Sequence, residues 1–399
     1  MKRSQAQRQR GLRGGGAVVS PRIDERGPMP LSSTALHGLH TELGGRSVEF
    51  AGLELPVQFA GVIAEHRHTR AAASLFDVGH MGQVVVRAVS GDLADAAAAL
   101  ETLIPANVAG LGPWRQRYGL FTTDSGGVSD DLMFAHHGDH YFLVVNAART
   151  GHDLALLGGL PGVAVEHLTD RALLALQGPR AEEALSTLMP TAAGLRFMDS
   201  RILDFGGVEA WVSRSGYTGE DGFEISIPNP DAEGLARALL GLDWVLPAGL
   251  GARDSLRLEA GMPLYGHELS ETISPIEAGL AWAIPKVRRP GGSRAGGFPG
   301  AEIILAQLAN GVPRQRVGLK VAGRVPVREG AALFRNVNDS EPVAKVTSGG
   351  FGATVGGPIA MAMLPVDMTP GSTVHAEVRG KRLPLSVVTL PFVNPSYKR

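Results

Sequence analysis

The stretch RYGLFTTDSGGVSDDLMFAHHGDHYFLVVN, residues 117–146, decides the fold that the sequence predicts. It contains three short runs rich in apolar, aromatic and β-branched residues, and the turn sequences DSGG and HHGD separate them. Runs of this length between Gly- and Asp-containing turns are typical of strands joined by hairpins. We therefore expect a meander of three antiparallel strands.

On both sides of this meander, short predicted helices alternate with short predicted strands. The pattern predicts helices over residues 63–73, 92–100, 149–157, 181–188, 231–240 and 250–259. It predicts further strands over residues 83–87, 163–166 and 173–177, and a Gly206-Gly207 turn predicts a hairpin between 200–206 and 208–214. Because helices and strands do not alternate strictly, the pattern favours an α+β fold with antiparallel sheets.

After Arg314 the pattern changes to a series of strand-like runs. They include RVGLKVAG, EPVAKVTSG, IAMAML, TVHAEVRG and RLPLSVVTL, and Gly, Pro or Asn residues separate them at near-regular spacing. Such spacing predicts a small all-β barrel or sandwich. We divide the chain into a disordered arm over residues 1–30, a central region over 31–310 and a C-terminal β domain over 311–399. The segment 286–300, KVRRPGGSRAGGFPG, is predicted to be an exposed loop before a helix over 302–308.

The composition excludes several kinds of chemistry. The 399 residues contain no cysteine, which excludes disulfides, thiolate metal sites and a cysteine nucleophile. The 38 Lys and Arg against 39 Asp and Glu give a net charge of −1, so no global attraction to nucleic acid or to a membrane surface is expected. No apolar run approaches the ~18 residues of a membrane span, and no Walker A, zinc or nucleophile-elbow motif occurs. The first 30 residues are basic and Gly-rich, which fits either a flexible arm or a transit peptide, and the lack of a clear amphipathic helical stripe favours the flexible arm.

Two adjacent carboxylates, Asp130 and Asp131, lie at the start of the second strand of the meander. Neighbouring side chains of a strand point to opposite faces, so at most one of the two carboxylates can face a given pocket. Tyr118 lies on the preceding strand, and Asn146 ends the following one. Polar groups on neighbouring strands can converge on one pocket, which favours a functional site over the alternative that both carboxylates only solvate a turn.

The sequence SRSGYTGEDGFE, residues 213–224, has glycine at every third position from 216 to 222. Glycines permit positive φ angles and a close approach of a ligand, although an ordinary long turn can have the same composition. Glu224 starts a predicted strand and could accept two N–H donors from a flat 2-amino-oxo heterocycle. The alternative for Glu224 is an exposed strand residue.

The predicted helix GLGARDSLRLE, residues 249–259, places Arg253 and Arg257 one turn apart on one face. The two arginines could form salt bridges with Asp254 or Glu259. If a pocket lies beside them, they could instead hold a ligand carboxylate.

Three histidines raise the question of a metal or acid–base site. His80 lies in the string DVGHMG, and His66 and His68 lie on a predicted helix. Two residues apart on a helix, His66 and His68 point in different directions, which is poor geometry for metal ligands. We interpret His66 and His68 as structural residues.

Several strings of the sequence resemble the T-protein family of the glycine cleavage system. They are FAGLELPVQF, LFDVGHMGQVVV, GGVSDDLMF, LVVNAA, LLALQGP, SRSGYTGEDGFEI, PAGLGARDSLRLEAGMPLYGHEL and VTSGGFGATVGGPIAMAML, in the family's order. The resemblance covers about residues 36–393, and the SRSGYTGEDGFE and GLGARDSLRLEAG runs are highly specific. The sequence departs from the usual pattern at Gly79, Ala135 and Asn394, where other members often carry serine, tyrosine and arginine.

The resemblance implies a three-lobed cloverleaf, with two interleaved antiparallel α+β folate-binding lobes and a C-terminal β-barrel. It implies that tetrahydrofolate binds in the central cavity, that Asp131 is the catalytic carboxylate and that Glu224 holds the pterin ring. The further residues that it places around this cavity are Met81, Tyr118, Asn146, Tyr217, Arg253 and Arg328. The implied aminomethyltransferase reaction moves the methylene of a carrier-bound aminomethyl group to tetrahydrofolate, which releases ammonia and gives 5,10-methylenetetrahydrofolate. No metal is expected.

The implied partner is the lipoyl carrier, or H-protein, and neither nucleic acid nor a membrane is an expected partner. The expected location is the cytoplasm of a bacterium, or the mitochondrial matrix if the N-terminal arm is a transit peptide. One alternative is a tetrahydrofolate-dependent demethylase of a small methylated amine or sulfonium compound on the same scaffold. The other is a non-catalytic folate-binding relative, but that group carries a cysteine-containing signature, which a chain without cysteine cannot have.

Overall fold

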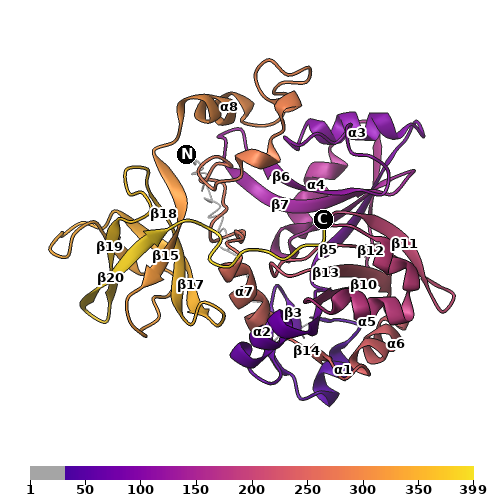
Figure 1. Ribbon diagram of the computed structural model, residues 1–399. Coiled ribbons are helices and arrows are strands. Elements are labelled where there is room, and N and C mark those ends of the chain that lie inside the picture. Colours follow the sequence, from indigo (N-terminus) through magenta and orange to yellow (C-terminus); the bar gives the residue numbers. More distant parts are fainter. Residues whose placement is uncertain (1–31) are drawn as a thin grey trace, which may run out of the picture. The chain divides into compact units, whose positions relative to one another are not determined.

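Residues 32–399 are described in the computed structural model, and their strands form three open β-sheets and one closed β-barrel (Figure 1). These are a five-stranded sheet, a six-stranded sheet, a three-stranded sheet and a closed barrel. The predicted α+β class is confirmed. The predicted arm over residues 1–30 lies outside the described residues. None of the helices in residues 32–399 has both the length and the apolar character of a membrane span.

The five-stranded sheet contains the predicted meander, and every neighbouring pair of its strands is antiparallel. Its strands, in spatial order, are β6 (Gln116–Thr122), β7 (Val128–His136), β8 (Tyr141–Val145), β5 (Gly82–Ala88) and β9 (Val163–His167). Side chains alternate between the two faces along each strand. In β5, Val84 and Val86 pack in a core with helices α3 (Leu93–Glu101) and α4 (Thr150–Gly158), whereas Val85 belongs to a second core.

The six-stranded sheet is assembled from distant parts of the chain. Its strands, in spatial order, are β11 (Ser200–Phe205), β12 (Val208–Ser213), β13 (Gly222–Pro228), β10 (Arg171–Gln177), β4 (Ala73–Asp77) and β14 (Val245–Pro247). Helices α5 (Ala181–Leu188) and α6 (Asn229–Leu240) contribute to the core on this sheet. The predicted hairpin is β11–β12, where Gly206 and Gly207 have φ angles of 60° and 93° that only glycine adopts without strain.

The chain crosses between the two large sheets twice. The chain passes from β4 in the six-stranded sheet to β5 in the five-stranded sheet, and β10 returns it to the six-stranded sheet. One buried core is shared by the two sheets, with Phe76 and Leu173 from one and Val85 and Phe142 from the other. Met133 of β7 packs against this core. The two lobes are therefore interleaved, and the face of β7 that carries Met133 is turned toward the shared core.

The three-stranded sheet was not predicted from the sequence pattern. It comprises β1 (Ser32–Ser33), β3 (Leu53–Gln58) and β2 (Arg46–Phe50), and the remaining helices are α1 (His37–Glu42), α2 (Val62–Ala71), α7 (Leu250–Glu259) and α8 (Ala301–Asn310). Strand β2 is exposed along nearly its whole length, so it lacks the apolar–polar alternation of a half-buried strand. Gly249, directly before α7, lies so close to β3 that an added Cβ would be 2.4 Å from the Val57 carbonyl carbon.

The C-terminal strands close into a barrel, which confirms the all-β prediction for this region. Their order is β15 (Arg314–Val321), β18 (Gly357–Pro365), β17 (Ala344–Gly352), β16 (Ala332–Phe334), β19 (Thr373–Val378) and β20 (Lys381–Val388). Val317, Leu319 and Leu385 belong to its buried core. Leu258 of α7 packs against Ile359 of β18, so α7 contacts the barrel as well as the rest of the chain.

The segment 286–300 is only in part the exposed loop that the sequence predicts. Arg288 is buried and forms an ion pair with Glu101 of α3, and Arg294 pairs with the same carboxylate. Phe298 is also buried. The Gly and Pro residues correctly indicated an irregular backbone, but local composition could not show that arginines anchor it to a distant helix.

Candidate functional site

The turn before β7 fixes the place of the Asp130–Asp131 pair. Gly126 has a φ of 82°, in the left-handed region that glycine adopts without strain. Gly127 lies so close to Glu271 that an added Cβ would be 1.9 Å from the Glu271 carbonyl oxygen. Only glycine therefore fits at position 127, and the Gly-Gly sequence determines where β7 begins.

The two carboxylates point to opposite faces of β7, as strand alternation predicts. Asp130 is fully buried, and its carboxyl lies beside that of Asp153 on α4. Asp131 is half-buried, and the Tyr118 phenol donates a hydrogen bond of 3.1 Å to its Oδ2. Only Asp131 of the pair lies on the face of β7 that is turned toward the shared core.

Asn146 joins the two carboxylates at the end of β8. Its side-chain amide donates to Asp130 Oδ1 at 2.9 Å and to Asp131 Oδ1 at 2.8 Å, and its backbone N–H donates to Asp130 Oδ2 at 3.2 Å. Val145 lies opposite Leu132 in the β7–β8 register, which brings the next residue beside the Asp pair. The structure therefore shows the expected convergence of polar groups from three neighbouring strands.

Burial raises the pKa of Asp131 to about 7, and the nearby Asp130 carboxylate adds to this rise. The hydrogen bonds from Asn146 and Tyr118 act in the opposite direction, because they stabilise the ionised form. A carboxyl with this pKa changes its protonation near neutral pH. Shifts of this kind, produced by burial together with specific neighbours, are concentrated at catalytic sites.

Buried polar groups hold the glycine-rich loop between β12 and β13. Arg214 is buried and donates from Nε to Asp221 Oδ1 at 2.9 Å. The amide of Gln177 on β10 donates to the Ser215 carbonyl at 2.9 Å. Gly216 passes so close to Gln177 that an added Cβ would be 1.8 Å from its Oε1. The loop is therefore tightly packed and is not an ordinary exposed turn.

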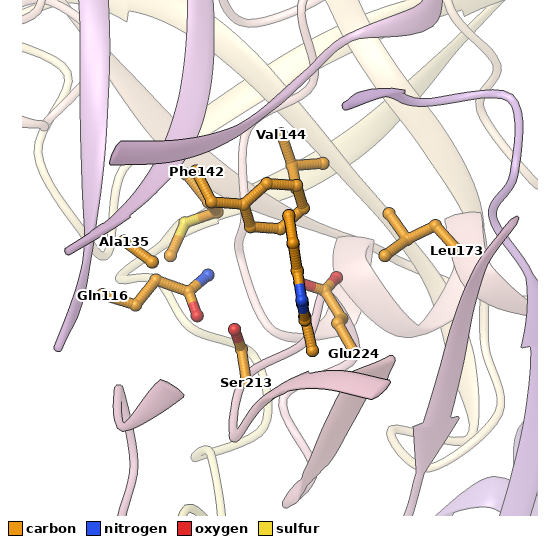
Figure 2. Close-up of a pocket in the computed structure, with 9 residues that line it drawn as sticks. Gln116, Ala135, Phe142, Val144, Leu173, Ser213 and Glu224 are labelled. Carbon is orange, nitrogen blue, oxygen red and sulfur yellow. The ribbon is translucent and has the colours of Figure 1, made fainter. Parts of the chain in front are cut away.

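Glu224 follows this loop on β13 and lies in a pocket between the two large sheets (Figure 2). The residues that line the pocket are Gln116, Met133, Ala135, Phe142, Val144, Leu173, Trp211, Ser213 and Glu224. Figure 2 shows the polar ends of Gln116, Ser213 and Glu224 turned toward the same space, with apolar side chains around them. Ser215 Oγ donates to Glu224 Oε2 at 3.2 Å. The cavity volume of about 10 Å³ leaves room for one water molecule.

Arg253 and Tyr217 lie together, with the Glu224 carboxylate near Arg253 and the Asp131 carboxylate near Tyr217. The Arg253 guanidinium is 5.1 Å from the centre of the Tyr217 ring, and its Nη1 is shielded from solvent without a hydrogen-bond partner in residues 32–399. Burial lowers the pKa of Arg253, and the Glu224 carboxylate opposes this shift. The Tyr217 hydroxyl donates to the Pro263 carbonyl, and its pKa is raised by burial and by the Asp131 carboxylate. The unused N–H of Arg253 can bind a ligand acceptor.

Arg257, one turn later on α7, is part of the structural core. It is 2% exposed and forms ion pairs with Glu268 at 3.0 Å and with Asp254 at 2.8 Å. Its Nη2 also donates to Ser348 Oγ on β17 at 2.9 Å. Arg257 therefore forms salt bridges, which was one of the two roles expected for the arginine pair. Arg253 instead has an N–H without a partner in residues 32–399.

His80 and Met81 follow β4. Burial and the positive charge of Arg253 lower the pKa of His80 to about 3, so this imidazole is neutral at physiological pH. Met81 is half-buried and packs against the shared core. His66 is fully buried and bonded to Glu259 at 3.0 Å, which agrees with a structural role. In residues 32–399, no group of three or more His, Asp or Glu side chains is arranged to hold a metal ion.

The barrel approaches the site through Arg316. This residue of β15 donates to the carbonyls of Gly261 at 2.5 Å and Ala278 at 2.8 Å. It is near enough to Tyr118 to oppose the rise in the Tyr118 pKa that burial causes. Arg328 is exposed between β15 and β16, and no hydrogen bond or ion pair within residues 32–399 joins its side chain to the groups above.

Five neighbours of the site were not predicted: Gln116, Asp153, Ser215, Trp282 and Arg316. Trp282 is 64% exposed, and its ring lies 5.3 Å from that of Tyr118. A tryptophan in the run LAWAIP was an available signal for Trp282. Ser215 lies within the 213–224 motif, although its role beside Glu224 was not predicted. Gln116 carried no local signal, because its position depends on contacts between the two sheets.

The site combines a half-buried carboxyl that titrates near neutral pH, a second carboxylate in an aromatic-walled pocket and an arginine with an unused N–H. Such groups can hold a flat polar ring, bind an anionic group and stabilise a developing positive charge. The geometry therefore suits a transfer reaction that proceeds through a cationic transition state.

Comparisons with known proteins agree on one family. The family model described as the GCVT N-terminal domain matches residues 36–288, and that of the glycine cleavage T-protein C-terminal barrel domain matches residues 314–394. The mitochondrial aminomethyltransferase of Dictyostelium discoideum is 39% identical over 92% of this chain and 94% of its own length. The aminomethyltransferase of Geobacillus kaustophilus is 41% identical over 91% and 98%, respectively. The crystal structure of glycine cleavage system aminomethyltransferase T from Bartonella henselae is 40% identical, covers 93% of this chain and all of that one, and superposes with a TM-score of 0.84.

Proposed function

The chain belongs to the glycine cleavage T-protein family of aminomethyltransferases, and we propose that it transfers the methylene of a carrier-bound aminomethyl group to tetrahydrofolate. The proposed products are 5,10-methylenetetrahydrofolate, ammonia and the reduced thiol of the lipoyl carrier, the H-protein. The methylene carbon exchanges its bonds to nitrogen and sulfur for bonds to N5 and N10 of the folate. The two N–H protons of the folate end on the leaving nitrogen and the leaving sulfur, so the reaction balances without an oxidant.

The polar groups of the described residues match those of a folate, and the pocket at Glu224, with a cavity volume of about 10 Å³, has to open before the ring can enter. The buried Nη1 of Arg253 has no partner among residues 32–399, and Glu224 and Gln116 present polar atoms beside the aromatic rings of Phe142 and Trp211. A flat heterocycle with neighbouring N–H and carbonyl groups matches such a set of acceptors and donors. We therefore assign Glu224 to the pterin ring. The other proposed folate-binding residues are Met81, Tyr118, Asn146, Tyr217, Arg253 and Arg328. Four of them, Tyr118, Asn146, Tyr217 and Arg253, lie close to Asp131 or Glu224, whereas no described contact joins Met81 or Arg328 to these carboxylates.

Asp131 is the proposed catalytic carboxylate, and its position is the observation that carries the proposal. Its oxygens are held by Tyr118 at 3.1 Å and by Asn146 at 2.8 Å, and its pKa is raised to about 7. Positive charge develops on the methylene carbon as the amine leaves, and a fixed carboxylate nearby stabilises that charge. Holding the two reactants together supplies much of the remaining acceleration.

The partner and the location are proposed on the same grounds. The H-protein follows from the glycine cleavage system in the name of the Bartonella protein. The relatives include mitochondrial and bacterial proteins. We propose the bacterial cytoplasm, or the mitochondrial matrix if residues 1–30 act as a transit peptide.

The test is a transfer assay with an aminomethyl-loaded lipoyl carrier protein and tetrahydrofolate. Ammonia release and methylenetetrahydrofolate formation are both measured, and reactions without folate and with Asp131→Asn are the controls. We expect both products to form in a folate-dependent way. Folate binding without either product would refute the transfer reaction and favour a folate-dependent demethylase of a small methylated amine or sulfonium compound.

A further inference from the structure

Helix α4 carries a carboxyl group that the proposed reaction does not use. Asp153 is fully buried, and neither of its oxygens has a conventional donor within residues 32–399. The group that faces it is a second carboxyl, that of Asp130 on β7, which lies near enough for the two carboxyls to share a proton in a hydrogen bond. An ionised carboxylate only accepts hydrogen bonds, so a bond between two carboxyls requires a proton on one of them.

The surroundings of the two groups show which one holds the proton. Asp130 accepts N–H donors from Asn146 at 2.9 Å and 3.2 Å, and such donors favour the ionised form. Asp153 has no N–H donor from the described part of the chain, and burial without a donor disfavours the ionised form. The proton therefore belongs on Asp153. Burial, followed by the contact with Asp130, raises the pKa of Asp153 to about 9.

The charged groups that face Asp153 come from β7 and from the turn before α4. Asp130 and Asp131 raise the pKa of Asp153, and Arg149 lowers it. Arg149 forms its ion pair with Glu271 at 3.2 Å, and none joins it to Asp153 within the described residues. No cation is therefore placed to neutralise an ionised Asp153 directly.

We propose that Asp153 is a neutral carboxylic acid that donates a hydrogen bond to Asp130 and, through Asn146, acts as a positioning residue for Asp131. The positioning role rests on the proposed function, in which Asp131 is catalytic. The Asp130–Asp153 pair then carries one negative charge, and Asp130 stays bonded to Asn146. With both groups ionised, repulsion would separate them and displace the amide that also holds Asp131.

The protonation state is tested by thermal unfolding against pH, which does not depend on catalysis. Asp153→Asn keeps the shape and an N–H donor but cannot ionise. The native pKa of Asp153 lies above its unfolded value of about 4, so the native protein releases this proton on unfolding and loses stability as pH rises toward about 9. We therefore expect the Tm of Asp153→Asn to gain on that of the native protein as pH rises through this range. The exposed Asp243→Asn should run parallel to the native protein. The neutral acid would be overturned if the Tm of Asp153→Asn ran parallel to that of the native protein across this pH range. It would also be overturned if the Tm of Asp153→Asn fell relative to the native Tm as pH rises.

The positioning role is tested by turnover in the transfer assay. Asp153→Asn should retain kcat within about 2-fold, whereas Asp153→Ala, which lacks the donor, should lose about 10-fold in kcat with little change in the KM for folate. The native enzyme should also lose activity above about pH 9 as Asp153 ionises, and Asp153→Asn should not. Full kcat in Asp153→Ala would overturn the positioning role. If the native protein forms no product, the proposed function fails, and the melting curves alone decide whether Asp153 is neutral.

Discussion

Tyr118 on β6 donates a hydrogen bond of 3.1 Å to Asp131 on the neighbouring strand β7. Together with the 2.8 Å bond from Asn146, it stabilises the ionised carboxylate. Burial and the Asp130 charge act in the opposite direction and raise the pKa of Asp131 to about 7. Because the resulting pKa lies close to neutral pH, the charge of Asp131 is sensitive to the loss of a single donor.

The first prediction concerns Tyr118→Phe, which removes this donor and nothing else from the phenol ring. A charge-assisted hydrogen bond contributes about 1.5 kcal/mol, which corresponds to a rise of about one unit in the pKa of Asp131. The proposed reaction needs the ionised form, so activity is lost as pH falls through this pKa. In the profile of kcat/KM against pH, the fall on the acid side should therefore lie about one pH unit higher in Tyr118→Phe than in the native enzyme. A fall at the same pH in both would mean that it does not report the Asp131 carboxyl.

The second prediction concerns Asp131→Asn, which keeps the size of the side chain and removes its charge. If Asp131 stabilises a cationic transition state, kcat should fall by about 100-fold or more, whereas folate affinity should change by less than about 3-fold. Turnover and folate binding are measured on the same preparation, with Asp243→Asn as the surface control. Turnover close to native would remove Asp131 from its proposed role.

The third prediction separates binding from chemistry at Glu224. Glu224→Ala removes the carboxylate from the aromatic-walled pocket and should raise the Kd for tetrahydrofolate by about 10- to 100-fold, because charge-assisted bonds to a ligand are lost. Ser215→Ala keeps the Glu224 carboxylate and removes the hydroxyl that lies 3.2 Å from Glu224 Oε2 and 3.4 Å from Gln116 Oε1, so its effect on Kd should be smaller. Titration calorimetry gives both values. Native affinity in Glu224→Ala would argue against the assignment of Glu224 to the pterin ring.

Parts of the fold that follow from local pattern were predictable from the sequence. The meander over residues 117–146 and the C-terminal strands are short runs rich in apolar and β-branched residues between turn signals, and both are observed. The hairpin β2–β3 was missed because β2 is exposed on both faces. The anchoring of Arg288 to Glu101 was missed because it joins two segments that are distant in the sequence.

The residues of the candidate site likewise divide into those that local sequence pattern indicates and those that only tertiary contacts bring to the site. Asp131 and Glu224 lie in compact motifs whose residue types suggest chemistry. Gln116, Asp153 and Arg316 reach the site only because sheets, helix α4 and the barrel come together, and no feature of their own neighbourhood in the sequence marks them. Tertiary pairing, which a single sequence does not display, supplies these neighbours.

The fourth prediction tests the close approach that sets the start of β7. Gly127→Ala places a Cβ 1.9 Å from the Glu271 carbonyl oxygen, so the turn has to move and to carry the Asp pair with it. Tm and turnover should both fall. Gly234→Ala on α6 is the matched control, since a Cβ there meets no atom within 4 Å, and alanine should stabilise the helix by up to about 1 kcal/mol. Native turnover in Gly127→Ala would show that the backbone yields without disturbing Asp131.

The last prediction uses the two arginines of α7, which are one turn apart and differ in their partners. Arg257 is paired with Glu268 at 3.0 Å, and both side chains are buried, so Arg257→Ala leaves a buried carboxylate without its cation. We expect a loss of about 3–5 kcal/mol in the free energy of unfolding. The Nη1 of Arg253 has no partner in residues 32–399, so Arg253→Ala should change the free energy of unfolding by less than about 1 kcal/mol and weaken folate binding instead. Urea unfolding measures the first effect, and folate titration measures the second.

The Arg257→Met/Glu268→Gln double variant decides whether the loss comes from the unpaired charge. Removing both charges together should restore a large part of the stability lost in Arg257→Ala, because no buried carboxylate is then left uncompensated. If the double variant is as unstable as the single one, the packing and hydrogen bonds of Arg257 to Ser348 and Asp254 account for its contribution. Equal losses of stability in Arg253→Ala and Arg257→Ala would contradict the division of the two arginines into a ligand-binding and a structural residue.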